Sequence, residues 1–171
     1  MQKMDFSGAD WQLGALSGLA LGGMLASNTH LVWLDLSHNF MAAPGRGVAW
    51  AGAVAHALRG AAALRTLKLR FCALCVEGGI ELANALRTTR ALTLLDLRDN
   101  ELLTPVASFD DGTPHRSERN TDAVRALIAA LRVNATLATP LATLRLDNNG
   151  LPALALERLR RAGREGLKIT G

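Results

Sequence analysis

Cys72 and Cys75 are the two residues whose type and spacing point most directly to chemistry, because a C-x-x-C pair can exchange disulfides or bind zinc. A structural zinc site needs four ligands, and the sequence contains only these two cysteines. The sequence context of a thioredoxin-like motif is absent as well. We therefore expect both cysteines to have a structural role.

Other groups of reactive residues fall short of a catalytic or metal-binding site. The four histidines, which are too scattered for their spacing to assemble a nucleophile, base and orienting acid, are His30, His38, His56 and His115. No phosphate-binding loop of the form G-x-x-x-x-G-K-[ST] occurs. The run Asp110-Asp111-Gly112 lacks the alternating carboxylates and the closing glutamate of a calcium loop. The sequence predicts a protein that is not an enzyme and uses no cofactor or metal.

The composition predicts one folded unit with a continuous core. The chain has 171 residues, of which 49% are apolar and 20% are charged. A net charge of +4 is too small to require nucleic acid or a membrane as partner. The first ten residues are acidic where a secretory signal would be basic, and the apolar stretch 13–26 is shorter than the roughly 20 residues of a membrane helix. We expect a cytoplasmic protein with no membrane span, and a protein partner rather than nucleic acid.

A repeated pattern of leucines runs through the chain. The spacing L-x-x-L-x-L-x-x-N/C-x-L, which is typical of leucine-rich repeats, occurs four times. The copies are LVWLDLSHNFM, LRTLKLRFCAL, LTLLDLRDNEL and LATLRLDNNGL, and they begin at residues 31, 64, 92 and 141. A degenerate copy opens the chain, with Met1, Met4, Phe6, Ala9 and Trp11 at the same positions.

Each copy predicts a short strand followed by a helix. Leucines at positions one, four and six bury one face of a parallel strand, and the asparagine or cysteine at position nine can bond the backbone of the following bend. Apolar pairs stand ten and six residues before each later strand, namely Leu21/Leu25, Val54/Leu58, Leu82/Leu86 and Leu127/Leu131. A gap of four is about one helical turn, so each pair lies on one face of a helix behind the sheet. For the last pair the count runs to Leu137, which makes 138–141 a small insertion.

These copies and spacers resemble the ribonuclease-inhibitor-like family of leucine-rich repeats, whose long repeats contain a helix. The resemblance covers most of the chain and implies an α/β solenoid, curved like a horseshoe, with parallel strands on the concave side and helices on the convex side. We expect a single domain, 1–171, of about five repeats that start near 1, 31, 64, 92 and 141. The end repeats of such an array need caps. We expect a C-terminal cap at 152–171 with a short strand near 167–169, and an open parallel edge at 4–6 that a partner could contact.

Two segments without the repeat pattern follow strands, at 42–47 and at 103–119. The longer one is rich in turn formers and charged residues, so it is expected to be a loop. Their shared place after a strand puts both on one rim of the solenoid. An insertion on one rim often marks the binding side, and a surface loop without a function is the alternative.

Side chains at positions three, five, seven and eight are expected to be exposed on the concave wall, where aromatic residues and arginines would contribute most to an interface. The candidates for partner binding are Trp33, Asp35, His38, Lys68, Arg70, Phe71, Asp96, Arg98 and Arg145. As an alternative, Asp35, Lys68 and Asp96 form a ladder of charge that only neutralises itself. Arg70 beside Arg98 is a like-charge pair, which favours a partner with an acidic patch.

The resemblance implies a protein–protein interaction module or scaffold that binds its partner through the concave face and the loop-bearing rim. Two alternatives stay open. Similar repeats occur in activators of the small GTPase Ran and in the ribonuclease inhibitor, so the chain could regulate an enzyme, although those proteins have more repeats and the Ran activators end in an acidic tail where this chain is basic. Substrate recognition for a ubiquitin ligase would need a ligase-recruiting segment, and none is evident in the sequence.

Overall fold

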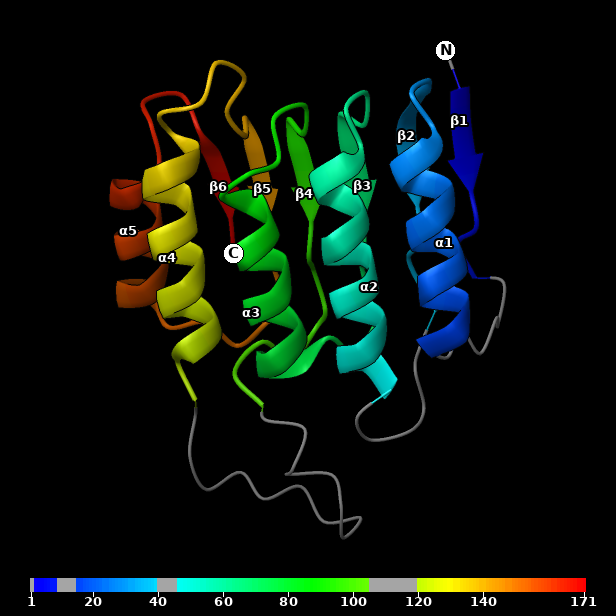
Figure 1. The fold of residues 1–171 in the computed structure, drawn as a ribbon. Coiled ribbons are helices and arrows are strands. Elements are labelled where there is room, and N and C mark those ends of the chain that lie inside the picture. The colour runs from blue at the N-terminus through cyan, green and yellow to red at the C-terminus, as the bar shows by residue number, and fades with distance from the viewer. Residues whose placement is uncertain (1, 9–14, 40–45, 105–119) are drawn as a thin grey trace, which may run out of the picture.

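The computed structural model describes residues 2–8, 15–39, 46–104 and 120–171 (Figure 1). Several residues discussed above lie outside these ranges, namely Met1, Ala9, Trp11, Met41, Asp110, Asp111, Gly112 and His115. Most of the two segments expected as rim loops, at 42–45 and 105–119, lies outside them too.

Within the described residues the chain alternates between strand and helix. The strands are β1 Gln2–Asp5, β2 Leu31–Asp35, β3 Thr66–Lys68, β4 Leu94–Asp96, β5 Thr143–Arg145 and β6 Lys168–Thr170. The helices are α1 Ala15–Ser27, α2 Arg46–Gly60, α3 Cys75–Leu86, α4 Asp122–Asn134 and α5 Ala153–Ala162. The expected loop 42–47 is wrong at its end, because Arg46 and Gly47 belong to α2. In an α-helix each N–H bonds the carbonyl four residues back, so the turn that holds the completely buried Trp50 reaches back to Arg46.

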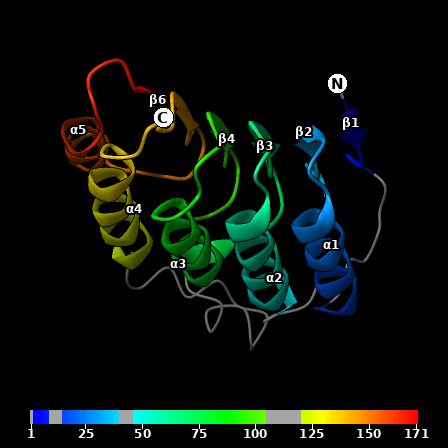
Figure 2. The same cartoon turned by 45° about the horizontal axis from the view of Figure 1, so that its top comes forward.

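All of these strands form one parallel sheet in which the spatial order β1 to β6 equals the order along the chain. The register aligns position five of every copy in a single row, which consists of Asp5, Asp35, Lys68, Asp96 and Arg145 and continues to Thr170 in β6. The helices lie side by side along one side of the sheet, each in contact with the next (Figures 1 and 2). The described chain therefore has one layer of strands and one layer of helices, and the α/β prediction with a parallel sheet is confirmed.

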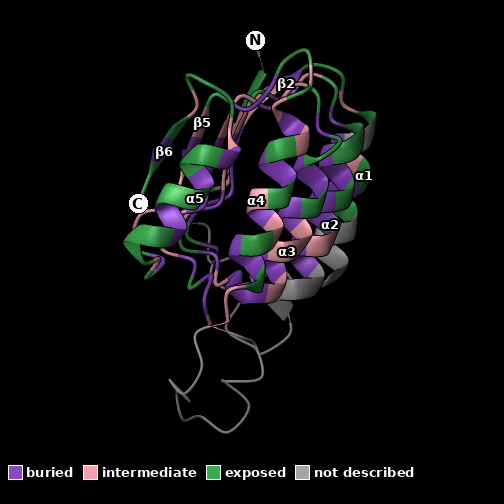
Figure 3. Ribbon diagram, turned by 90° about the vertical axis from the view of Figure 1, so that its left-hand side faces the viewer, coloured by how far each residue is buried: buried purple, intermediate pink, exposed green. Residues whose placement is uncertain are grey.

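The core lies between these two layers. The leucines at positions one, four and six are buried, namely Leu31, Leu34, Leu36, Leu64, Leu67, Leu69, Leu92, Leu95, Leu97, Leu141, Leu144 and Leu146. Every predicted helix pair packs against them, with Leu21 half-buried and the other members buried. The exposed residues of the helices face outward (green in Figure 3). Because side chains alternate along a strand, positions three and five point to the opposite face of the sheet.

The two edges of the sheet are formed by β1 and β6. β1 pairs only with β2 among the described residues, and Gln2, Lys3 and Asp5 are exposed. The expected edge at 4–6 begins earlier and ends at Asp5, whose Oδ1 accepts the backbone N–H of Ser7 at 2.9 Å and so starts a turn. At the other edge β6 pairs with β5, at the place where a short last strand is expected.

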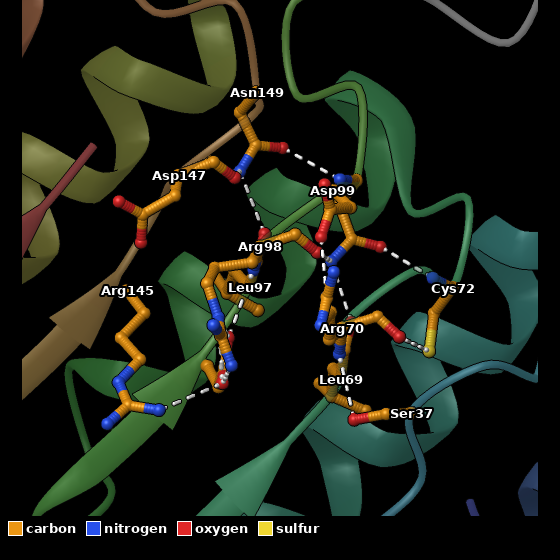
Figure 4. Close-up of polar contacts among 12 residues, drawn as sticks. Ser37, Leu69, Arg70, Cys72, Leu97, Arg98, Asp99, Arg145, Asp147 and Asn149 are labelled. Atoms are coloured by element: carbon orange, nitrogen blue, oxygen red, sulfur yellow. Dashed lines mark hydrogen bonds and ion pairs between the residues drawn. The ribbon is translucent and has the colours of Figure 1, made fainter.

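Buried asparagines at position nine connect the turns that follow the strands (Figure 4). The Asn100 amide donates to the carbonyl oxygen of Leu69 at 2.7 Å, and its Oδ1 accepts the backbone N–H of Cys72 at 2.9 Å. Asn149 makes the same two bonds one strand later, to the Leu97 carbonyl at 2.8 Å and from the Asn100 N–H at 2.9 Å. Each asparagine thus satisfies the backbone of the preceding copy, and we call this series the asparagine ladder.

Cys72 occupies the asparagine position in its copy, and it makes the same contacts with sulfur. Its thiol donates to the Leu36 carbonyl at 3.3 Å and receives a hydrogen bond from the backbone of Asn39. Sulfur is a weak donor and a weak acceptor, so this is the weakest step of the asparagine ladder.

We expect the substitution Cys72→Asn to raise the free energy of unfolding by about 1 kcal/mol, because a carboxamide would replace both sulfur contacts with ordinary hydrogen bonds. Urea unfolding followed by circular dichroism measures the change. A less stable variant would show that the site has no room for the larger amide.

Candidate protein-binding surface

The sheet face opposite the helices carries most of the candidate binding residues. We call it the strand face and define it by Trp33, Asp35, Lys68, Arg70, Asp96, Arg98 and Arg145. The parallel register brings these side chains from four neighbouring strands, β2 to β5, onto one surface. His38 and Phe71 lie in the turns that follow β2 and β3.

The expected exposure of the strand face is wrong for its two carboxylates. Asp96 is completely buried and Asp35 is 7% exposed. Longer cationic side chains cover them: Lys68 of the neighbouring strand β3 has its Nζ 3.0 Å from Asp35 Oδ2, and Arg98, two residues after Asp96, binds Asp96. Asp35 and Asp96 therefore position other residues, and a partner that binds the folded chain meets the cations above them.

Asp96 forms ion pairs with Arg98 and Arg145, whose side chains are labelled in Figure 4. Arg98 approaches with Nε 2.9 Å from Oδ1 and Nη2 2.7 Å from Oδ2, and Arg145 Nη1 lies 3.5 Å from Oδ2. Burial on its own raises the pKa of Asp96, but the hydrogen bonds and charge of Arg98, with the charge of Arg145, outweigh it and hold the pKa below the ordinary value. Asp96 is therefore ionised at neutral pH and fixes the orientation of the Arg98 guanidinium, while Arg145 lies at a longer distance.

Arg70 pairs with a different carboxylate. Its Nε lies 2.6 Å from Asp99 Oδ2, and this hydrogen bond lowers the pKa of Asp99. Arg70 and Arg98 follow neighbouring strands as expected, but each has its own counterion. The prediction that repulsion between Arg70 and Arg98 favours an acidic partner is therefore wrong, because each arginine is already paired with a carboxylate.

Charge on the strand face is separated by depth. The side chains of the four cations, Lys68, Arg70, Arg98 and Arg145, are 30% to 42% exposed, whereas those of their carboxylate partners are 0% to 19% exposed. The alternating ladder is correct for Lys68 with Asp35, while Asp96 binds Arg98 and Arg145. A partner would thus meet cationic groups whose orientation is already fixed by the carboxylates beneath them.

Aromatic side chains lie beside these cations in the N-terminal part of the strand face. Lys68 Nζ is 4.7 Å and Lys3 Nζ 5.9 Å from the centroid of the Trp33 ring, within the range of a cation–π contact. The rings of His38 and Phe71 are 5.6 Å apart between centroids, and Phe71 is 47% exposed. Aromatic residues and arginine are the types enriched in the centres of protein interfaces.

Cys72 and Cys75 are free thiols and both are buried. Burial raises the pKa of each thiol to about 12. The thiolate is the form that attacks disulfides and binds metals, so these surroundings favour the structural role that we expect for the pair.

In the described part of the chain no group of three or more His, Cys, Asp or Glu residues could hold a metal ion. No helix there is long and apolar enough to cross a membrane.

We expect both thiols to resist alkylation in the folded chain. A thiol with a pKa of about 12 has only about one molecule in ten thousand as thiolate at pH 8, and burial blocks access as well. Timed reaction with iodoacetamide followed by mass spectrometry measures this, with the chain in concentrated guanidinium chloride as the reactive control. Rapid alkylation of the folded chain would indicate an activated pair.

Comparison with known proteins finds a likeness in structure. No family model and no curated protein matches the sequence. Among solved structures, the chain is similar to the tropomodulin C-terminal domain of Caenorhabditis elegans, with a TM-score of 0.66 and 12% identity over 95% of this chain and 81% of that one. The fold is what they share. That domain contains leucine-rich repeats, which agrees with the repeat pattern and the parallel sheet found here.

Proposed function

We propose that this chain is a leucine-rich-repeat solenoid of the ribonuclease-inhibitor-like kind, that it binds another protein through its strand face, and that it carries out no chemistry of its own. The solenoid is supported by the strand order, which follows the chain, and by the helix that separates each pair of consecutive strands. The observation that carries the binding role is that four cations, Lys68, Arg70, Arg98 and Arg145, lie above their carboxylate partners on the face that the helices leave uncovered.

Fixed cations favour binding because less side-chain freedom is lost when a partner arrives. An ordinary surface arginine gives up about 0.5–1.5 kcal/mol of side-chain entropy when an interface immobilises it. Arg98 has already given up part of this freedom, since two of its nitrogen atoms are bonded to Asp96. Trp33 adds a large apolar surface between Lys3 and Lys68. These features suit a protein surface of mixed apolar and polar character.

We place this function in the cytoplasm. Cys72 and Cys75 are free thiols, and reducing conditions would keep them so. A scaffold that joins other proteins fits this setting, and nothing in the described residues favours an enzyme-regulating role over it.

The experiment needs a strand-face variant that still folds. Arg98→Glu is unsuitable because it would place a second carboxylate against buried Asp96. Trp33→Thr combined with Arg70→Ser is better, because Thr66 and Thr143 occupy position three and Ser37 position seven in neighbouring copies. A matched control is Leu154→Ala with Arg158→Gln, which changes two exposed residues of α5 in the helix layer.

Affinity purification from cell extract with quantitative mass spectrometry compares the intact chain, the strand-face variant and the control, after circular dichroism shows that all three are folded. We expect a partner that the intact chain and the control retain and the strand-face variant loses, and calorimetry with that purified partner should show the same order. Partners that stay on the strand-face variant and leave the control would contradict the proposal. Faster GTP hydrolysis by a captured GTPase would favour the regulator alternative.

A further inference from the structure

Phe71 has a backbone conformation that is unfavourable for its side chain. It occupies position eight, where every described copy has a positive φ: Gly8 at 64°, His38 at 60°, Phe71 at 55°, Asp99 at 57° and Asn148 at 61°. Glycine, asparagine and aspartate adopt this left-handed conformation readily, whereas a bulky side chain there is an outlier. Phe71 is the one large apolar residue among the described non-glycine residues with positive φ.

Burial covers the side chain of Phe71 only in part. Phe71 is 47% exposed, so much of its apolar ring stays in water despite the unfavourable backbone conformation. Cys75 shows the contrast, because its positive φ goes with a small side chain that is almost completely buried. Leu154, the other exposed large apolar residue of the described chain, lies in helix α5 and is not strained.

The surroundings of Phe71 indicate what it could bind. Its ring lies against the exposed ring of His38 at 5.6 Å, tilted by 33°. The neighbouring residue, Arg70, bonds Asp99 through Nε, which leaves its two Nη groups able to donate to another acceptor. An apolar ring and an outward cationic group thus stand next to each other on the turn after β3.

We propose that Phe71, in the turn beside the strand face, anchors the partner protein, and that it receives an apolar side chain from an acidic segment of that partner, whose neighbouring carboxylate pairs with Arg70. This inference rests on the proposed protein-binding function and names the chemistry of the partner. A strained backbone conformation at a residue whose side chain stays partly exposed is typical of residues retained for function. A partner that covers the ring would bury the part that the folded chain leaves exposed.

A carboxylate fits this site better than a nucleic acid does. Binding to nucleic acid draws its affinity from cations that release counterions when they meet phosphates. Here each strand-face cation already has a carboxylate beneath it, and the whole chain carries only +4. Hydrogen bonds from a fixed guanidinium to a single carboxylate do not depend on a net positive field.

The first test is the stability of the Phe71→Asn variant, which installs the residue that Asn148 provides at the same position. We expect Tm to change by less than about 4 °C, since the strain that is removed and the partial burial that is lost offset each other. A larger fall in Tm would show that Phe71 is needed for the fold, and it would overturn the anchor role.

The second test uses a library of random displayed peptides selected on the intact chain. We expect the enriched peptides to pair an apolar residue with a neighbouring Asp or Glu. We expect them to bind Phe71→Asn at least tenfold more weakly and to bind Leu154→Ala unchanged. Replacement of the peptide's acidic residue by its amide should weaken binding to the intact chain and have little effect with Arg70→Ser.

Several outcomes separate this proposal from the proposed function. Peptides that bind Phe71→Asn as tightly as the intact chain, but are lost from Trp33→Thr with Arg70→Ser, would overturn the anchor and keep the strand face. Peptides that bind both variants equally would overturn the strand face itself. The acidic-segment chemistry would be overturned if the selection enriched basic peptides, purely apolar peptides or no peptide. Displacement of the peptides by single-stranded RNA at equal concentration would overturn it as well.

Discussion

Replacement of Asn100 by leucine is expected to lower the free energy of unfolding by about 2–5 kcal/mol. Asn100 is completely buried. Its amide donates to the carbonyl of Leu69 and its Oδ1 accepts the backbone N–H of Cys72. Leucine has a similar size but bonds neither group, so a backbone donor and a backbone acceptor would stay buried without partners. Each such orphan costs about 1–3 kcal/mol.

Urea unfolding of Asn100→Leu and of a control, Asn84→Leu, measures this effect. Asn84 is exposed on α3, and its replacement should change stability by less than about 0.5 kcal/mol, as is usual for surface positions. Equal losses in the two variants would mean that the asparagine ladder contributes no more than an ordinary surface residue.

Replacement of Arg98 by methionine is expected to lower the free energy of unfolding by about 2–4 kcal/mol at pH 7, somewhat less than for a fully buried pair because Arg98 is 30% exposed. The variant removes the side-chain bonds of Arg98 to Asp96 and leaves a buried carboxylate with the backbone N–H of residue 98 at 3.2 Å and the longer contact to Arg145. Methionine keeps most of the length of the side chain, so the loss reports the missing charge and hydrogen bonds.

The size of this loss should depend on pH. The pKa of Asp96 is lowered in the folded chain, so its stabilising contribution is present above the unfolded pKa near 4 and is lost as the pH falls through the folded value. Arg98→Met removes the side-chain bonds and the charge of Arg98, which lower the pKa of Asp96, and leaves the burial that raises it. The pKa of Asp96 is therefore higher in the variant, and protonation in acid removes the poorly compensated buried charge. The stability difference between the two chains should therefore shrink as the pH falls from 7 towards 3.

Chemical denaturation at several pH values between 3 and 7 measures this difference. Arg145→Met is the control, because a single contact of 3.5 Å to Asp96 should contribute less than about 1 kcal/mol. A loss for Arg98→Met that stays constant with pH would show that Asp96 is not the group responsible.

The leucine spacing was sufficient to predict the order of strands and helices and the residues of the core. The leucines at positions one, four and six can be buried together only if the strand places them on the side of the sheet that the helices cover. Pairs such as Leu82/Leu86 identify the face of each helix that packs against these leucines. The residue at which α2 begins and the burial of Asp35 and Asp96 could not be predicted from the sequence. That 1–171 is a single domain of five repeats stays a prediction, as does the contact of a partner with the β1 edge.

The arrangement of the strand face escaped prediction because its charges were compared only across strands. Asp96 and Arg98 are two residues apart and so point to the same side, which was a readable signal for their bond. Asp99, the partner of Arg70, was missed because position eight was taken as exposed wall. Gly8, Asp99 and Asn148 at this position were a second readable signal, since these residue types favour the left-handed turn that the structure shows.

Among the described residues each strand pairs only with the next strand in the row and each helix packs beside the next helix, which makes resistance to local opening uneven along the chain. Strands β3 and β4 have a bonded neighbour on both sides, whereas β1 has one and exposes most of its residues. Amide hydrogens near β1 should therefore exchange with solvent long before those of β4, and a protease should cut near that end first. The central copies should stay folded when β1 opens locally. The surface around Arg70 and Arg98 would then keep its structure while the β1 edge of the sheet opens and closes.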